Sequence, residues 1–284
     1  MQGPFQALAV AGLLGVLSQF VLPLALFSNS IIALYVLSRG KTEWFVVLIG
    51  TLLLVVGSSV FVVARPGIGF PLTLILMVPV VLCAKTLEIT ESQSLSVLVA
   101  VICAVVLALS IQLASGDAVQ WWADWLKVAV KGIKNASYEG FVENKTIDLM
   151  NGLVAMMFAF AAVLTVFIGR WLQAMLFNPG GFAKEFTQIK FSFSVLIGMI
   201  VILVVTAVIN ENLSKDFILI FTVPFFLQGM SVLHFTVKAM ARSQSYLWPP
   251  YLLLLFFPQY VIVGMAAVGL VDVFLNFRKP VRKG

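Results

Sequence analysis

The chain has 284 residues, of which 61% are hydrophobic and only 11% are charged, and its mean hydropathy is +1.08. Soluble domains carry roughly 25% charged residues, so this composition excludes a water-soluble globular fold. The formal net charge of +6 does not indicate nucleic-acid binding, because the basic residues lie mostly at the ends of apolar segments. The apolar runs lack the alternation of an outer-membrane barrel. The sequence therefore predicts an all-α polytopic bundle whose main partner is the lipid bilayer.

The apolar runs predict about eight or nine transmembrane helices, some of them broken by proline. We expect them at about 5–22, 24–38, 43–64, 70–87, 94–114, 149–176, 191–210 and 217–239, with 246–277 forming a short proline-broken piece followed by a full helix. The helix count stays open around 5–38, 70–87 and 246–277. The whole chain, 1–284, is expected to form a single integral membrane domain.

Lysine and arginine in short loops predict the orientation in a bacterial inner membrane. Arg39, Lys41, the 170–190 connection and the basic tail that begins at Arg278 are expected to be cytoplasmic. Both termini then lie in the cytoplasm, and the polar 115–148 stretch lies on the opposite side.

That stretch contains the pattern of an amphipathic helix. Tryptophan favours the headgroup region, so Trp121, Trp122 and Trp125 indicate a helix lying on the outer leaflet. Residues at helical spacing place one apolar face on Trp122, Trp125, Ala129 and Ile133, with Lys127, Lys131 and Lys134 opposite. Two interpretations remain open, namely simple anchoring and a lid over a lipid or ligand cavity.

Few polar residues lie at membrane depth, where ionisable groups are costly. Asp272 is expected to pair with Arg278 near the membrane surface. His234 is expected to be a hydrogen-bonded packing residue. Asn29, Gln228 and Gln259 either line a polar pocket or bridge neighbouring helices.

No motif of a known enzyme or metal site is present. The sequence contains no HExxH, GxSxG or Walker pattern, and Cys83 and Cys103 lie in apolar runs as expected of free buried thiols. We therefore expect no enzymatic activity and no cofactor, and we assign no catalytic, cofactor-binding or metal-binding residue.

The first helix carries a stripe of small residues, Ala7, Ala11 and Gly15, at spacing of four. Such a stripe allows another helix backbone to approach closely. It favours packing within the chain, with docking of a separate membrane subunit as the alternative.

The most distinctive local motif is GRWLQAMLFNPGGFAKEF at 169–186. A helix is expected to end near Arg170 and Trp171 at the interface, with Gln173 close by. A turn at Asn178, Pro179, Gly180 and Gly181 then leads into a short surface helix with Phe182 and Phe186 on one face. On this interpretation Lys184, Glu185 and Lys190 face water.

This block resembles the corresponding segment of the YybS-like family of bacterial membrane proteins. Two further stretches share the resemblance, namely Leu22-Pro23-Leu24 with Ser38-Arg39-Gly40, and Gly269-Leu270-Val271-Asp272 with Asn276-Phe277-Arg278-Lys279. The family is grouped distantly with the S components of energy-coupling factor transporters, which bind vitamins or metal ions and dock a coupling subunit through small residues of the first helix. Ala7, Ala11 and Gly15 stand where that stripe would be. The chain is longer than a six-helix S component and lacks a recognisable vitamin-binding signature.

Three functions follow as hypotheses. The first is a substrate-binding, transport-type component that holds a small apolar or amphipathic ligand between its helices. The second is an assembly partner or scaffold that uses the 178–186 element and the basic tail. The third is lipid handling, suggested by the tryptophan helix and the proline-broken spans.

Overall fold

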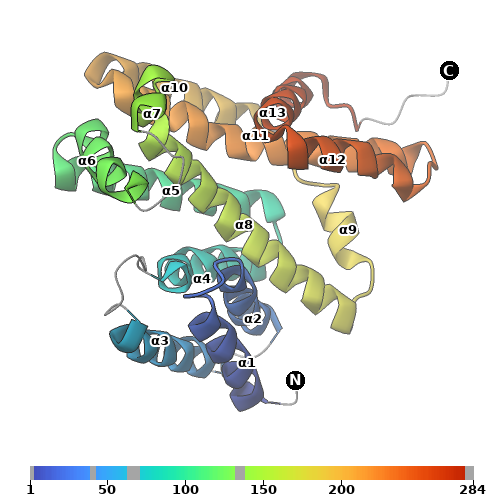
Figure 1. Cartoon of the computed structure of the whole chain (residues 1–284). Coiled ribbons are helices and arrows are strands. Elements are labelled where there is room, and N and C mark those ends of the chain that lie inside the picture. The colour runs from blue at the N-terminus through green and yellow to red at the C-terminus, as the bar shows by residue number, and fades with distance from the viewer. Residues whose placement is uncertain (1–2, 39–42, 63–70, 132–137, 279–284) are drawn as a thin grey trace. The chain divides into compact units, whose positions relative to one another are not determined.

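The computed structural model describes residues 3–38, 43–62, 71–131 and 138–278, and every regular element within these ranges is helical (Figure 1). The all-α prediction is therefore confirmed. The elements in chain order are α1 (Pro4–Leu17), α2 (Leu24–Ser38), α3 (Glu43–Val62), α4 (Leu72–Thr90), α5 (Gln93–Ser115), α6 (Ala118–Val130), α7 (Tyr138–Glu143), the 3-10 turn η1 (Ile147–Leu149), α8 (Met150–Phe177), α9 (Gly181–Phe186), α10 (Phe193–Ile209), α11 (Glu211–Ala239), the 3-10 turn η2 (Gln244–Leu247), α12 (Trp248–Phe256) and α13 (Pro258–Leu275).

Within the described ranges, six helical segments are long and apolar enough to cross a membrane. They are Glu43–Val60, Leu72–Thr90, Gln93–Ser115, Ile147–Phe177, Glu211–Ala239 and Pro258–Leu275. The helices α1, α2 and α10 are apolar but shorter. The chain is a multi-pass membrane protein, and each of these segments overlaps a predicted apolar run.

The end of α1 and the start of α11 differ from the prediction by more than one turn. The first helix ends at Leu17 rather than near residue 22, because the chain makes consecutive tight turns before Pro23. The expected start of α11 at residue 217 is wrong by two turns. Its true N-cap is Asn210, whose side-chain oxygen accepts hydrogen bonds from the backbone N–H groups of Asn212 and Leu213.

The last apolar run is divided as expected. The short helix α12 ends before Phe257, and Pro258 is the first residue of α13. Proline is tolerated at this position because the first N–H groups of a helix have no partner within it. Pro79, in contrast, is accommodated inside α4.

The described chain forms two compact units. Unit 1 comprises residues 1–100 and 160–188, and unit 2 comprises 101–159 and 189–284. The helices α5 and α8 contribute residues to both units.

In unit 1 the small-residue stripe of α1 packs within the chain. Ala7, Ala11 and Gly15 are buried, and α1 lies against α2 and α3. A Cβ atom on Gly15 would lie 2.7 Å from a methyl group of Val55, so the helices approach too closely for a larger residue. Ser28 of α2 donates a hydrogen bond of 2.7 Å to the carbonyl of Ala11. This face of α1 is therefore occupied inside unit 1.

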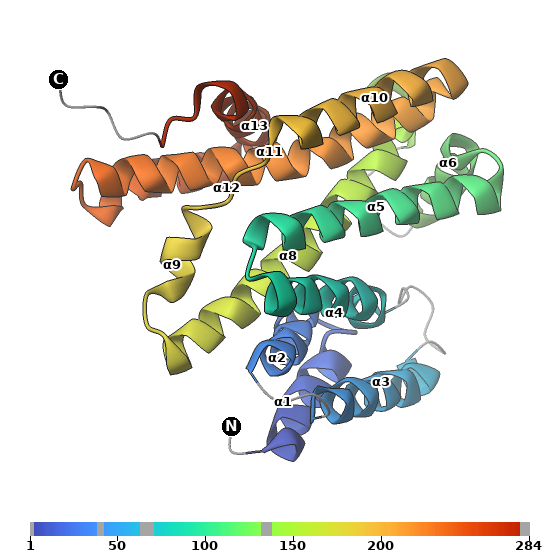
Figure 2. The same ribbon diagram turned by 180° about the vertical axis from the view of Figure 1, so that it is seen from behind.

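In unit 2 the helix α11 packs along α13, and α10 lies beside α11 (Figure 2). The α11–α13 contact depends on two glycines. A Cβ on Gly229 would lie 1.9 Å from the carbonyl oxygen of Met265, and one on Gly269 would lie 1.9 Å from that of Phe225. Backbone meets backbone here, so no flexible side chain can move aside.

We expect Gly269→Val to destabilise unit 2 by roughly 2–4 kcal/mol, because the added side chain forces α13 away from α11. Thermal unfolding in detergent micelles measures the change. The control is Gly264→Val on the same helix, where an added Cβ meets nothing within 4 Å. Equal melting temperatures for the two variants would contradict the close helix contact.

Candidate functional site

The turn between α8 and α9 has the geometry that the sequence predicts. The helix α8 continues past Arg170 and Trp171, where its end was expected, and ends at Phe177. Gly180 then adopts a positive φ of 83°, which favours glycine. Gly181 follows, and its backbone N–H donates to the carbonyl of Asn178 at 2.9 Å. A Cβ at Gly181 would lie 2.6 Å from the side-chain nitrogen of Asn178, which is exposed and can move aside, so the strict glycine requirement of the turn lies at Gly180.

An aromatic cluster fastens α9 to α8. The rings of Phe182 and Phe186 have centroids 5.6 and 5.8 Å from that of Phe167, in edge-to-face orientations. Edge-to-face pairs of this kind contribute roughly 0.5–1.5 kcal/mol beyond the area they bury. The apolar stripe of the short helix thus faces α8.

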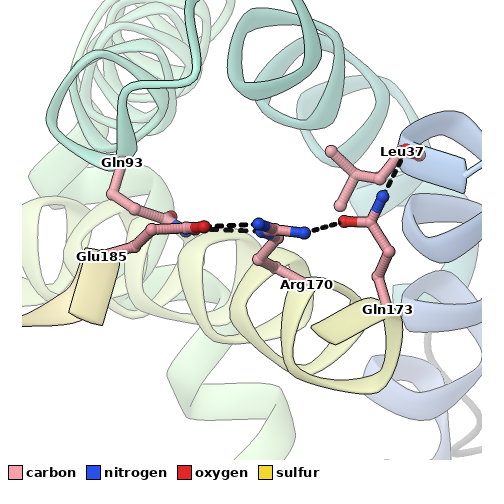
Figure 3. Close-up of polar contacts among 5 residues, drawn as sticks. All are labelled: Leu37, Gln93, Arg170, Gln173 and Glu185. Atoms are coloured by element: carbon pink, nitrogen blue, oxygen red, sulfur yellow. Dashed lines mark hydrogen bonds and ion pairs between the residues drawn. The ribbon is translucent and has the colours of Figure 1, made fainter. Parts of the chain in front are cut away.

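A polar cluster extends from this contact across unit 1 (Figure 3). The Arg170 guanidinium makes a two-pronged ion pair with the Glu185 carboxylate, with Nε 2.9 Å from Oε2. It also donates to the side-chain oxygen of Gln173, whose amide nitrogen in turn donates to the carbonyl of Leu37. Gln93 at the start of α5 donates to Glu185 at 3.0 Å. One arginine therefore links α2, α5, α8 and α9.

The electrostatics of Glu185 follow from this arrangement. Burial by itself would raise the pKa of the Glu185 carboxyl, but the hydrogen bonds from Arg170 and Gln93 and the positive charge of Arg170 outweigh it and lower that pKa below its ordinary value. The ionised form is therefore the one that holds the cluster together.

The expectation that Glu185 faces water is wrong. The carboxylate points to Arg170 because a long arginine at the end of a membrane helix lowers its desolvation cost by pairing. Lys184 is exposed as expected, and Trp171, Asn178 and Pro179 are also exposed.

Of the predicted 169–186 block, the structure brings together Arg170, Gln173 and Glu185. Gln93 also belongs to this cluster. The sequence did not predict its role, because Gln93 lies in a polar stretch that resembles an ordinary loop.

An apolar pocket lies beside this cluster. It has a volume of about 260 Å³ and is lined by Ile31, Leu34, Tyr35 and Ser38 of α2 and by Leu172, Met175, Leu176 and Phe177 of α8. Gln173 bonds to the carbonyl of the residue before Ser38, so the pocket and the polar cluster share the same helix ends.

In unit 2 the predicted polar residues Gln228, Asp272 and Arg278 come together. Gln228 donates to Asp272 at 2.7 Å and accepts from the backbone N–H of Phe191 at 2.9 Å. Arg278 lies 3.4 Å from the same carboxylate, and the backbone N–H of Phe277 donates to it at 2.8 Å. Burial lowers the pKa of the Arg278 guanidinium, although the charge of Asp272 acts in the opposite direction. Asp272 therefore pairs with Arg278 at the C-terminal end of α13, as the sequence predicted.

The remaining predicted polar residues are dispersed. Asn29 bridges helices, since its amide nitrogen donates to the carbonyl of Thr73 on α4 at 3.1 Å. His234 lies 2.8 Å from the hydroxyl of Tyr251. Gln259 is exposed. None of these three joins a common site within the described residues.

The predicted face of the tryptophan helix is only partly right. The side of α6 that packs into unit 2 carries Trp122 and Leu126, whereas Trp121 and Trp125 are about half exposed. The buried face is rotated because α6 packs on Ile147 and neighbouring residues rather than on lipid alone. An amphipathic pattern cannot by itself distinguish protein from lipid as the apolar partner.

Sequence reasoning missed a second buried polar group, formed by Asn151 and Asp216. Asp216 lies one residue before the expected span of 217–239, so it was not among the residues predicted at membrane depth. Recognising Asn210 as an N-cap would have placed Asp216 on the helix.

Several predictions concern residues outside those that the structure describes, namely Arg39, Lys41, Ile133, Lys134 and the tail after Arg278. In the part of the chain that is described, no group of three or more His, Cys, Asp or Glu side chains is placed to hold a metal ion. Comparison with protein-family models, with curated proteins and with solved structures finds no match to this chain. The family resemblance thus stays a prediction from sequence.

We expect Glu185→Gln to loosen α9, because it leaves the half-buried Arg170 without its counter-charge. The cost should be about 1–2 kcal/mol, less than for a fully buried pair because both side chains keep some contact with solvent. Hydrogen exchange of the α9 amides measures the loss, and Lys184→Gln on the same helix is the control. Unchanged exchange in Glu185→Gln would show that the aromatic cluster alone holds α9.

The ion pair also predicts a pH dependence. The folded-state pKa of Glu185 lies below its ordinary value of 4.5, so its stabilising contribution is complete above that value and is lost as the pH falls through the folded-state pKa. Hydrogen exchange of α9, corrected for its intrinsic pH dependence, should therefore stay constant from neutral pH down to the ordinary glutamate range and rise below it. In Glu185→Gln this acid step should be absent, and its persistence would assign the step to another group.

Proposed function

We propose that this multi-pass membrane protein is a substrate-binding, transport-type component of a bacterial inner membrane, and that it holds a small amphipathic ligand in the pocket between α2 and α8. The observation that carries the proposal is this apolar pocket at the ends of two membrane helices, next to an ordered polar cluster. Both chain termini are cytoplasmic in the proposal, and it includes no catalytic step.

The size and lining of the pocket favour a ligand with one apolar chain. Its volume of about 260 Å³ lies just below the range of roughly 300–1,000 Å³ for small-molecule sites. Leu34 of α2 and Leu172 of α8 both supply apolar surface. The Ser38 hydroxyl is buried and has no hydrogen-bond partner within the described part of the chain, so it offers a polar contact at one end.

Charge favours an anionic head group. The sequence continues from Ser38 with Arg39 and Lys41, two cations within three residues of the pocket lining. Arg170 is already neutralised by Glu185. A carboxylate or phosphate group on the ligand is therefore the complement that the local sequence favours.

The segment that carries the family resemblance supports the same proposal. Leu172 and Met175 line the pocket, and they lie in the same block as Arg170, Gln173 and Glu185. We accordingly propose that the chain is a member of the YybS-like family and that this block shapes the ligand site.

A second candidate, lipid handling, is favoured by the same apolar lining, because an acyl chain of a phospholipid has the same chemistry as the chain of a free ligand. The two functions differ in the head group that the protein selects.

Leu172→Trp is the test, because the larger side chain fills the pocket. Palmitate serves as the anionic single-chain probe, and its saturable binding to detergent-purified protein should weaken by roughly tenfold or more in this variant. Leu53→Trp on the exposed face of α3 is the control and should bind like the unsubstituted protein. Both variants need unaltered melting temperatures for the comparison to hold.

The outcomes separate the three functions. Pocket-dependent binding of palmitate supports the proposed function, and selective pocket-dependent binding of phosphatidylglycerol instead supports lipid handling. Binding that is equal in Leu172→Trp and the unsubstituted protein overturns the pocket assignment and leaves the assembly role.

A further inference from the structure

A buried hydrogen-bonded network in unit 2 centres on Asn151 in the first turn of α8. Its side-chain oxygen accepts from the indole N–H of Trp122 on α6 at 3.3 Å. Its side-chain nitrogen donates to Asp216 on α11 at 2.5 Å and to the carbonyl of Ala108 on α5 at 3.3 Å. All three side chains are more than nine-tenths buried. One amide group thus joins a carboxylate to an indole.

The Asp216 carboxylate has only neutral partners within the described residues. Besides Asn151, the backbone N–H of Gly152 donates to it. The neighbouring cation on α11, Lys215, is paired with Glu211 at 2.9 Å and is also attracted by Asp148 of η1. Asp216 therefore differs from Asp272, which has Arg278 beside it.

The other charged groups on the surrounding elements point elsewhere. On α6, Asp124 and Lys127 pair with each other at 2.9 Å and are exposed. The helix α10 and the part of α5 from Val101 to Ser115 contain no ionisable side chain other than Cys103. On α7, Glu139 and Glu143 are not buried. Asp216 is thus the deeply buried acid of this region.

The hydrogen-bond directions suit the ionised carboxylate, because both of its oxygens lie against donors. The atom Oδ2 faces the Asn151 nitrogen, and Oδ1 lies beside Gly152. Each oxygen has two lone pairs, and a proton on the lone pair that accepts the hydrogen bond would meet the donor. The backbone at Gly152 cannot reorient, whereas a side-chain amide can rotate and present its oxygen. Protonation at Oδ2 is accordingly accommodated by rotation of the Asn151 amide.

That rotation has a consequence for α6. With its oxygen turned to Asp216, Asn151 presents its NH₂ group to the indole N–H of Trp122, so two donors face each other and the hydrogen bond is lost. The bond to the Ala108 carbonyl is lost as well. A buried donor left without a partner retains the full cost of its desolvation, which weakens the attachment of α6.

We propose that Asp216 is a proton-binding site and that the Asn151 amide transmits its occupancy to Trp122. The proton comes from water and adds to Oδ2, and it returns to water when the carboxyl ionises again. Asp216 lies in the second turn of α11, five residues after the exposed Glu211, so this end of the helix is where the proton would exchange with water. The proposal is independent of the α2–α8 pocket.

The indole N–H resonance of Trp122 reports on this relay directly. In protein labelled with ¹⁵N-tryptophan, the resonance is assigned among six tryptophans by Trp122→Phe. We expect it to shift with pH along a one-proton curve, as its acceptor is lost on acidification. In Asp216→Asn, which cannot ionise, the curve should disappear. Asp124→Asn and Asp148→Asn each remove another acid of the surrounding elements and should retain it.

Asn151→Ala provides a second variant, because it keeps both the carboxyl and the indole but removes the relay. Its Trp122 resonance should no longer follow pH. A Trp122 curve that persists in Asp216→Asn or in Asn151→Ala, or a resonance in the unsubstituted protein that stays constant until acid unfolding, would overturn the proposal.

Discussion

Helices inside a bilayer gain little by burying apolar side chains against each other, because lipid chains are equally apolar. Association must come from close van der Waals packing and from hydrogen bonds that lipid cannot supply, and both kinds of contact recur in this structure. Gly229 and Gly269 let the backbones of α11 and α13 meet, and Gly169 lets α8 approach α2 so closely that a Cβ would lie 3.0 Å from the Ser30 carbonyl. Ser30 in turn donates to the carbonyl of Thr165 on α8. Each unit is thus held by small residues with polar bonds beside them.

The same constraint governs where charge is tolerated. Arg170 and Glu185 form a pair where α8 ends, and Asp272 with Arg278 does the same at the end of α13. Both pairs are completed by neutral amides, from Gln93 and Gln228 respectively, which satisfy lone pairs that a single ion pair leaves open. Such pairs fix geometry more than they add net stability, because the cost of removing both charges from water offsets much of their attraction.

The sequence predicted most of the features that depend on local chemistry. Long apolar runs fix the spans, Asn178 to Gly181 fix the turn, and the short separation of Asp272 and Arg278 fixes their pairing. The sequence-based predictions were wrong where the environment of a side chain depends on which other helix packs against it. Glu185 lies on a short helix whose polar side was expected to face water, yet Arg170 approaches it from α8. Trp122 is buried because Ile147 and its neighbours cover that side of α6. Helical periodicity predicts neither of these two contacts, because it indicates only which face of a helix is apolar.

The environment of Asp216 depends both on a local sequence signal and on tertiary contacts. Its position on α11 depends on a local signal, the Asn210 cap, whereas its meaning depends on tertiary contacts with Asn151 and Gly152. A carboxylate this deeply buried is costly when, as here among the residues that the structure describes, no cation lies beside it. The pairs at Arg170 and Asp272 show that the same chain places a cation beside a buried acid elsewhere. Neutral hydrogen-bond donors therefore stabilise the Asp216 carboxylate by themselves. The donor from Asn151 is available only while its amide keeps its present orientation. A change of one proton at Asp216 therefore alters the packing of α6 through this amide.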